Sequence, residues 1–179
     1  MSLLPVMTGY FGCRARPASA SVPLKFCAVS TMEIQPDFRD LFALFNAHKV
    51  EYLIVGGYAL AFHGAPRYTG DIDVFVRPQS PNARRILDAL AAFGFQFPDL
   101  TIEDFNSPDK VVQLGMPPVR IDLITSITGV SWDEADASKE AGTFGDVPVF
   151  YIGRERYLAN KRATGRKKDL ADLAALEEQ

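Results

Sequence analysis

The sequence has few of the residues that build zinc sites and disulfide frameworks. It contains 2 cysteines and 2 histidines in 179 residues, and both cysteines, Cys13 and Cys27, lie near the N-terminus. No Cys/His zinc set can be assembled from so few ligands, and two cysteines in a terminal segment do not make a disulfide framework. The scarcity of both residue types excludes the small folds that depend on such cross-links.

Long hydrophobic runs are also missing. The longest apolar region, 52–65, is interrupted by glycines and is shorter than the ~18 apolar residues that a membrane-spanning helix needs. Hydrophobic residues nevertheless make up 47% of the chain and charged residues 23%, which is enough for a hydrophobic core. We therefore expect one soluble globular domain and no membrane association.

Charge is distributed unevenly along the chain. Three of the 19 basic residues and none of the 22 acidic residues lie in 1–32, whereas 33–153 is strongly acidic and 154–168 is basic. A nucleic-acid-binding footprint would call for a basic domain, and this acidic body does not look like one. The pattern instead suggests that a cluster of carboxylates and a cluster of cations meet at one site.

The N-terminal segment 1–32 has neither acidic residues nor clear periodicity. It lacks the apolar run of a secretory signal, so we expect a disordered tail or a translated stretch upstream of the true start, with a transit peptide as the alternative. The folded domain is expected to span 33–179.

Hydrophobic periodicity predicts the secondary structure of this domain. Asp37 is expected to cap the first helix, Gly94 to end the third, and Pro117-Pro118 to join two strands. These elements predict an α+β fold with a mixed β-sheet flanked by helices. The expected helices cover 37–48, 58–63, 82–93, 154–163 and 168–177, and the expected strands cover 52–55, 71–76, 110–116, 119–125 and 147–152.

Asp71 and Asp73 lie two positions apart in a predicted strand. Alternate residues of a strand share a face, so the two carboxylates project together. Like charges held so close favour a divalent cation between them. The alternative is that one aspartate caps a turn and the other is solvated at the strand end.

Gly56 and Gly57 follow the preceding strand and begin a predicted helix. Glycines allow a sharp turn, and the free amides at a helix N-terminus suit a phosphate. A plain tight turn is the alternative. The 13 residues between Gly57 and Asp71 allow one helix and a return loop, so both motifs can share one cleft.

Asp122 supplies a third carboxylate. Alternation places it on one strand face with Arg120, away from its apolar neighbours. A partly buried acid needs a partner. A salt bridge to Arg120 or to another cation is the alternative to a role in metal binding.

Together these residues resemble the nucleotidyltransferases of the DNA polymerase beta-like superfamily. Their signature is Gly-Gly or Gly-Ser, a helix and loop, Asp-x-Asp, and a third Asp on a neighbouring strand. The string from Gly56 to Asp73, with Asp122, is similar in particular to minimal nucleotidyltransferases and AbiEii-type toxins. The resemblance covers roughly 37–176.

This resemblance implies transfer of a nucleoside monophosphate from a nucleoside triphosphate to a hydroxyl of a protein, an RNA or a small molecule. It implies two Mg²⁺ ions, or Mn²⁺, bound by Asp71, Asp73 and Asp122 as the catalytic residues. It also implies a cytoplasmic protein with a cognate antitoxin or helical partner protein. A non-catalytic nucleotide-binding or antitoxin module and an aminoglycoside-modifying enzyme are the alternatives.

The resemblance assigns further nucleotide-binding residues besides Gly56 and Gly57. Arg67 is expected to contact phosphate, Thr69 to orient Asp71, and Lys161 to bind the triphosphate. A Lys-Asp-x-x-Asp run follows Lys161 at 168–172. A solvent-facing arginine and a turn threonine are the alternatives for Arg67 and Thr69, and His63 is expected to be a packed histidine.

Overall fold

The structure is a computed structural model that describes residues 2–3, 35–95, 98–116 and 119–178. The expected tail 1–32, apart from Ser2 and Leu3, lies outside the described residues, as does the Pro117-Pro118 connection. Within the described part of the chain, no helix is long and apolar enough to cross a membrane.

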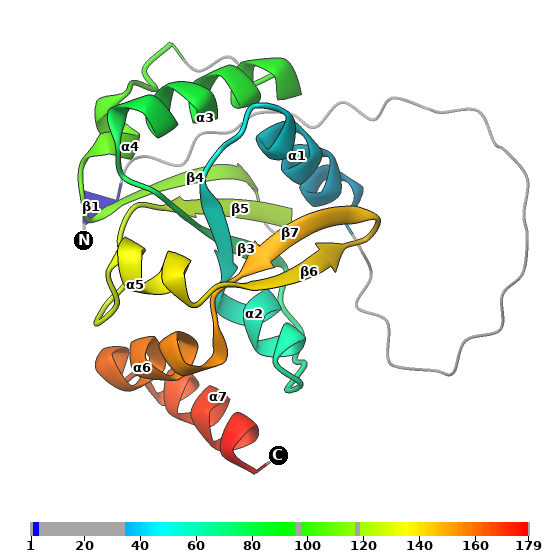
Figure 1. Cartoon of the computed structure of the whole chain (residues 1–179), viewed down its shortest axis with the longest axis vertical. Helices are drawn as coiled ribbons and strands as arrows, with labels where there is room; N and C mark the ends of the chain where they lie inside the picture. The colour runs from blue at the N-terminus through cyan, green and yellow to red at the C-terminus, as the bar shows by residue number, and fades with distance from the viewer. Residues whose placement is uncertain (1, 4–34, 96–97, 117–118, 179) are drawn as a thin grey trace, which may run out of the picture.

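The described strands form one mixed, seven-stranded sheet in the order β1-β4-β5-β3-β2-β7-β6 (Figure 1). Strand β3 is parallel to β5 and antiparallel to β2, and β2 is parallel to β7. The predicted α+β class with a mixed sheet is confirmed. The strands are β1 (Ser2–Leu3), β2 (Tyr52–Val55), β3 (Asp71–Val76), β4 (Lys110–Met116), β5 (Val119–Ile124), β6 (Glu140–Phe144) and β7 (Val147–Tyr151).

The helices flank this sheet. Figure 1 shows α1 and α3 together at one end of the view and α6 and α7 at the other. The sequence pattern does not predict the two short helices α4 and α5. The helices are α1 (Pro36–Ala47), α2 (Gly56–Phe62), α3 (Ser80–Phe93), α4 (Glu103–Asn106), α5 (Trp132–Ala137), α6 (Arg154–Thr164) and α7 (Lys167–Glu177).

The start of α1 differs from the prediction. Gln35 is the N-cap, Pro36 occupies the first turn, and no side chain caps the helix. Proline suits this position because its fixed φ is helical and it has no N–H group that needs a partner. Asp37 is therefore not the cap, and it lies inside the first turn, where a carboxylate interacts favourably with the helix dipole. The predicted stop of α3 is confirmed, because Gly94 adopts φ 103° at the C-cap.

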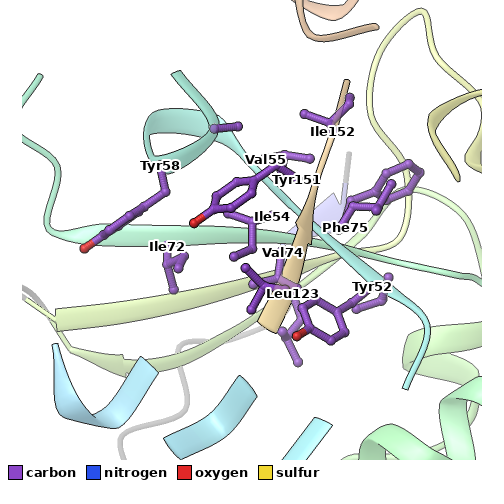
Figure 2. Packing of buried hydrophobic residues seen from close by; sticks show 14 of the residues in the cluster. Tyr52, Ile54, Val55, Tyr58, Ile72, Val74, Phe75, Leu123, Tyr151 and Ile152 are labelled. Atoms are coloured by element: carbon purple, nitrogen blue, oxygen red, sulfur yellow. The ribbon is translucent and has the colours of Figure 1, made fainter. Parts of the chain in front are cut away.

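The hydrophobic core has parts on both faces of the sheet. On the first face, Phe42 of α1 stacks on Tyr52 of β2 with ring centroids 5.3 Å apart. On the second face, Trp132 of α5 packs edge-on against Phe75 of β3 at 5.0 Å. Figure 2 shows part of this core, including Val74 of β3. The remaining part of the second face carries polar residues.

Candidate functional site

The turn between β2 and α2 brings the backbone unusually close to β3. Gly56 has φ +63°, and a Cβ atom added to it would collide with the carboxylate of Asp73. A Cβ atom on Gly57 would lie only 3.0 to 3.2 Å from three side-chain atoms of Thr69. Gly56 is therefore required both by this contact and by its left-handed backbone conformation, whereas a side chain at Gly57 would need Thr69 to shift.

The parallel pairing of β3 and β5 arranges four charged residues as two neighbouring pairs. Asp71 pairs with Arg120, and Asp73 pairs with Asp122. Because alternate residues share a face, all four side chains project from the same side of the sheet. The intervening Ile72 is fully buried on the opposite face. The predicted proximity of the three aspartates thus follows from strand register.

Arg120 bridges two of the three carboxylates. Its Nε donates to Oδ1 of Asp122 at 2.8 Å, and its Nη2 donates to Oδ2 of Asp122 at 3.0 Å. The same Nη2 donates to Oδ2 of Asp71 at 2.8 Å. Gln113 of β4 adds a longer hydrogen bond to Asp122, at 3.4 Å. The salt bridge between Asp122 and Arg120, one of the two alternatives considered for this aspartate, is present in this conformation.

Asp73 is the aspartate that Arg120 does not bond. No described residue donates a hydrogen bond to its carboxylate, which is partly buried. Burial raises the pKa of Asp73 to about 6, with a further contribution from the neighbouring Asp122. Burial also raises the pKa of Asp122, against the opposing effect of Arg120. The cluster therefore has three carboxylates and one guanidinium, which bonds only two of them, so the site has an excess of acidic groups.

The donor set suits a hard divalent cation. Aspartate oxygens are the ligands that Mg²⁺ and Mn²⁺ take in proteins, and Asp73 has a carboxylate without a hydrogen-bond donor. In the present conformation, no three acidic, histidine or cysteine residues of the described chain are grouped closely enough to hold a metal. Arg120 lies between Asp71 and Asp122, and it occupies carboxylate oxygens that a metal bound by all three aspartates would use.

Thr69 and Arg67, in the loop before β3, have different roles. The Thr69 hydroxyl donates to the main-chain carbonyl of Asp71 at 3.1 Å, which fixes the first residue of the strand. Arg67 instead forms two hydrogen bonds, of 2.8 and 3.2 Å, with the carboxylate of Asp172 on α7. Its predicted contact with phosphate remains a prediction, and the structure places it in an ion pair.

Lys161 lies in a buried ionic network between α6 and α7. Its Nζ is 2.7 Å from Asp169 and 3.3 Å from Asp172. Burial opposes ionisation of Asp169, but hydrogen bonds from Arg166, Lys161 and Thr164 outweigh it and hold the pKa of Asp169 below its usual range. Lys161 also lowers the pKa of Asp73 by its charge. The predicted triphosphate ligand thus lies near the acidic cluster, held by two carboxylates.

Two further features lie outside the acidic cluster. His63 is packed as expected, with Nε2 2.8 Å from the carbonyl oxygen of Ile152. A separate cavity of about 500 Å³ lies between α2, the following loop and α7, and Arg67 and Asp172 form part of its wall. None of the three clustered aspartates lines this cavity, so it is distinct from the acidic cluster.

The sequence pattern does not indicate two of the contributors to the site. Gln113 of β4 pairs directly with Asp122 in the antiparallel register, which the sequence alone does not fix. The sequence indicates Arg120 only as a possible partner of Asp122, but it also bonds Asp71 across the strands. Residues 71 and 73 have the same spacing as residues 120 and 122. Parallel pairing of the two strands would therefore indicate this second contact.

Known proteins resemble this chain in sequence and in fold. A profile of the family described as "Nucleotidyl transferase AbiEii toxin, Type IV TA system" matches residues 39–135. The fold is similar to that of a candidate nucleotidyltransferase from Thermotoga maritima, with TM-score 0.53, 16% identity and coverage of 79% of this chain and 91% of that chain. It is also similar to a lincosamide antibiotic adenylyltransferase bound to lincomycin, with TM-score 0.51, 15% identity and coverage of 79% and 94%. No curated protein matches the chain significantly.

Proposed function

The chain belongs to the AbiEii nucleotidyltransferase family, and from this premise we propose that it transfers a nucleoside monophosphate from a nucleoside triphosphate to an acceptor hydroxyl. The observation that carries the proposal is the register of β3 and β5, which sets Asp73 beside Asp122 on the face where Gly56 approaches. Catalysis of this kind needs positioning and charge stabilisation more than a covalent nucleophile.

In this proposal Asp71, Asp73 and Asp122 hold Mg²⁺ or Mn²⁺. The bound metal would neutralise triphosphate charge and polarise the reacting oxygens. The acceptor oxygen forms a bond to the α-phosphorus, the bond from that phosphorus to the α–β bridging oxygen breaks, and pyrophosphate leaves. Asp122 takes the acceptor's proton, a role consistent with a carboxyl whose pKa is raised by burial.

The remaining residues position the triphosphate. The backbone at Gly56 and Gly57 has no side chain between it and the acidic cluster, so a phosphate can approach its amides. Thr69 fixes the start of β3 through its bond to the Asp71 carbonyl. Lys161 and Arg67 supply positive charge, and both would have to share or release carboxylate partners to reach a phosphate.

Two labels on the nucleotide test the reaction. With α-³²P-labelled nucleoside triphosphates, we expect the label to appear on a protein, RNA or small-molecule acceptor from a cell extract. With γ-³²P label, the radioactivity should leave as pyrophosphate, whereas label on the acceptor would indicate a kinase instead. The combined substitutions Asp71→Asn and Asp73→Asn should abolish transfer, and Asp133→Asn, whose side chain is 89% exposed, is the control. Transfer that persists without the two aspartates would contradict the assignment.

The family description also motivates a partner. We propose that the protein acts in the cytoplasm as the toxin of a toxin–antitoxin pair, with an antitoxin protein as its cognate partner. Expression of the wild-type chain should arrest growth, and expression of the Asp71→Asn, Asp73→Asn variant should not. The second candidate, a non-catalytic nucleotide-binding module, predicts triphosphate binding without label transfer. The presence of all three aspartates favours the enzyme.

A further inference from the structure

Arg120 occupies the position between Asp71 and Asp122 in which a cation is needed. Its guanidinium engages Oδ2 of Asp71 and both carboxylate oxygens of Asp122, at 2.8 to 3.0 Å. The arginine side chain is 24% exposed and that of Asp122 is 11% exposed, so these contacts are partly shielded from water. Forked contacts of this kind are among the stronger protein hydrogen bonds.

Arg120 and a metal would compete for the same carboxylate oxygens. Both oxygens of Asp122 are already acceptors for Arg120, as is one oxygen of Asp71. A divalent ion at these carboxylates would also lie close to the guanidinium, and like charges at such a distance repel. Arg120 at these contacts therefore opposes the binding of a metal at the same carboxylates.

The surroundings of Arg120 allow it to leave. Gly115 of β4 is its direct partner in the antiparallel register, so no side chain from that position stands beside it. If a metal replaces Arg120, the guanidinium loses both acidic partners and needs another anion. A triphosphate bound at the metal would provide one, because phosphate oxygens match the planar donor set of arginine.

We propose that Arg120 is a cationic placeholder, displaced from Asp71 and Asp122 when metal enters and then bound to the triphosphate. This inference rests on the proposed metal-dependent function. It makes the binding of metal and of nucleotide mutually dependent. A metal that binds alone displaces Arg120 from its two carboxylate partners and offers it no new anion, so it binds weakly. A metal that binds with nucleotide offers Arg120 the triphosphate as a new partner, so it binds more tightly.

Binding of Mn²⁺ alone tests the first half of the proposal. Free Mn²⁺ is measured by electron paramagnetic resonance during titration of the metal-free protein. Arg120→Gln should bind Mn²⁺ at least about fivefold more tightly than wild type, the lower end of usual coupling between sites. Arg77→Gln is the matched control, because Arg77 is 29% exposed and pairs with Glu51 at 2.7 Å, away from the cluster. It should leave Mn²⁺ affinity unchanged.

Binding of a non-hydrolysable nucleoside triphosphate in the presence of Mn²⁺ tests the second half. Arg120→Gln should bind this analogue at least about fivefold more weakly than wild type, so that the two affinities change in opposite directions. A residue that only supports the fold would weaken both. Thermal unfolding shows whether each variant is folded. If Arg120→Gln is not, Arg120→Lys, which keeps the charge but loses the forked donor set, should show the same two changes at smaller size.

The outcomes separate the inference from the function on which it rests. Mn²⁺ affinity that is equal or weaker in Arg120→Gln overturns the placeholder, even if wild type binds Mn²⁺ at a site that Asp71→Asn plus Asp73→Asn removes. If neither wild type nor Arg120→Gln binds Mn²⁺ at a site that depends on these aspartates, the proposed metal-dependent function fails and the placeholder fails with it.

Discussion

The carboxylate of Asp73 lies directly against Gly56, in the space that a side chain at position 56 would fill. This contact joins the β2–α2 turn to the acidic cluster on β3 and β5. It explains why glycine is needed there for two separate reasons, a left-handed backbone and the absence of a Cβ atom. The two requirements can be separated by experiment.

Gly56→Ala should reduce nucleotidyl transfer by about 100-fold or more, because the added methyl group displaces Asp73 and small displacements of a reacting group have effects of this size. Gly94→Ala is the control, since Gly94 also has positive φ, +103°, but a Cβ atom there meets nothing within 4 Å. Both variants should lose stability, and only Gly56→Ala should lose activity. Equal activity in the two variants would contradict the steric role of Gly56.

The raised pKa of Asp73 predicts a pH-dependent gain in stability for Asp73→Asn. The folded pKa is about 6 and the unfolded value is about 4, so ionisation of Asp73 disfavours the folded state. That penalty is absent below pH ~4, grows between about 4 and 6, and is complete above 6. Without metal, Asp73→Asn should be more stable than wild type above pH 6, by on the order of 2 kcal/mol.

Urea unfolding at pH 4.5 and 7.5, in buffer with EDTA, measures this difference. The advantage of Asp73→Asn should be small at pH 4.5 and largest at pH 7.5. Mg²⁺ at pH 7.5 should then stabilise wild type more than the variant, since it binds the ionised carboxylate. A stability difference that does not change with pH would contradict the buried-charge explanation.

The ion pairs between α6 and α7 should differ strongly in their effect on stability. The side chains of Lys161 and Asp169 are 7% and 0% exposed, and Nζ of Lys161 lies 2.7 Å from Oδ1 of Asp169. Asp169→Asn leaves a buried lysine without its nearest charge and should destabilise the protein by about 3 kcal/mol. Arg162 and Glu177 form an ion pair of 2.7 Å between the same two helices, but their side chains are 58% and 54% exposed.

Glu177→Gln is therefore the matched control, and it should change the free energy of unfolding by less than about 1 kcal/mol. Chemical denaturation of both variants at pH 7 gives the comparison. Equal destabilisation by the two substitutions would show that burial does not determine the contribution of the Lys161 network.

The hydroxyl of Thr69 offers a test of positioning. Thr69→Val removes the bond to the Asp71 carbonyl but keeps the methyl group that contacts the Gly57 position. We expect a fall in transfer rate of about tenfold, the equivalent of one hydrogen bond. Thr69→Ser keeps the hydroxyl and should retain most of the activity. If valine is tolerated as well as serine, the hydroxyl has no positioning role.

Much of this arrangement could be predicted from the sequence, because strand period alone places Asp71 with Asp73 and Asp122 with Arg120. The elements that were missed have weak local signals. Strand β6 carries Glu-Ala-Gly-Thr-Phe, and only Phe144 is buried in it, so no alternation marks it. Helix α5 is six residues long, with Trp132 packed on Phe75. Tertiary contacts of this kind cannot be read from spacing.

The sequence pattern also does not predict which charged side chains form ion pairs with one another. The basic segment 154–168 suggested cations available to an anionic ligand, but Lys161 and Arg166 are bonded to Asp169. Arg67 reaches across the fold to Asp172, 105 positions away in the chain. Which cation meets which carboxylate depends on how α6 and α7 dock beside the loop, and no local pattern specifies that.

The central claim is that Asp71, Asp73 and Asp122 form one metal-dependent nucleotide site. Anomalous diffraction from crystals grown with Mn²⁺ and a non-hydrolysable nucleoside triphosphate tests it most directly. We predict manganese density bounded by these three carboxylates, with the triphosphate beside Gly56 and Gly57 and with Arg120 released from Asp71. Manganese or nucleotide bound elsewhere, with Arg120 still bridging Asp71 and Asp122, would contradict the claim.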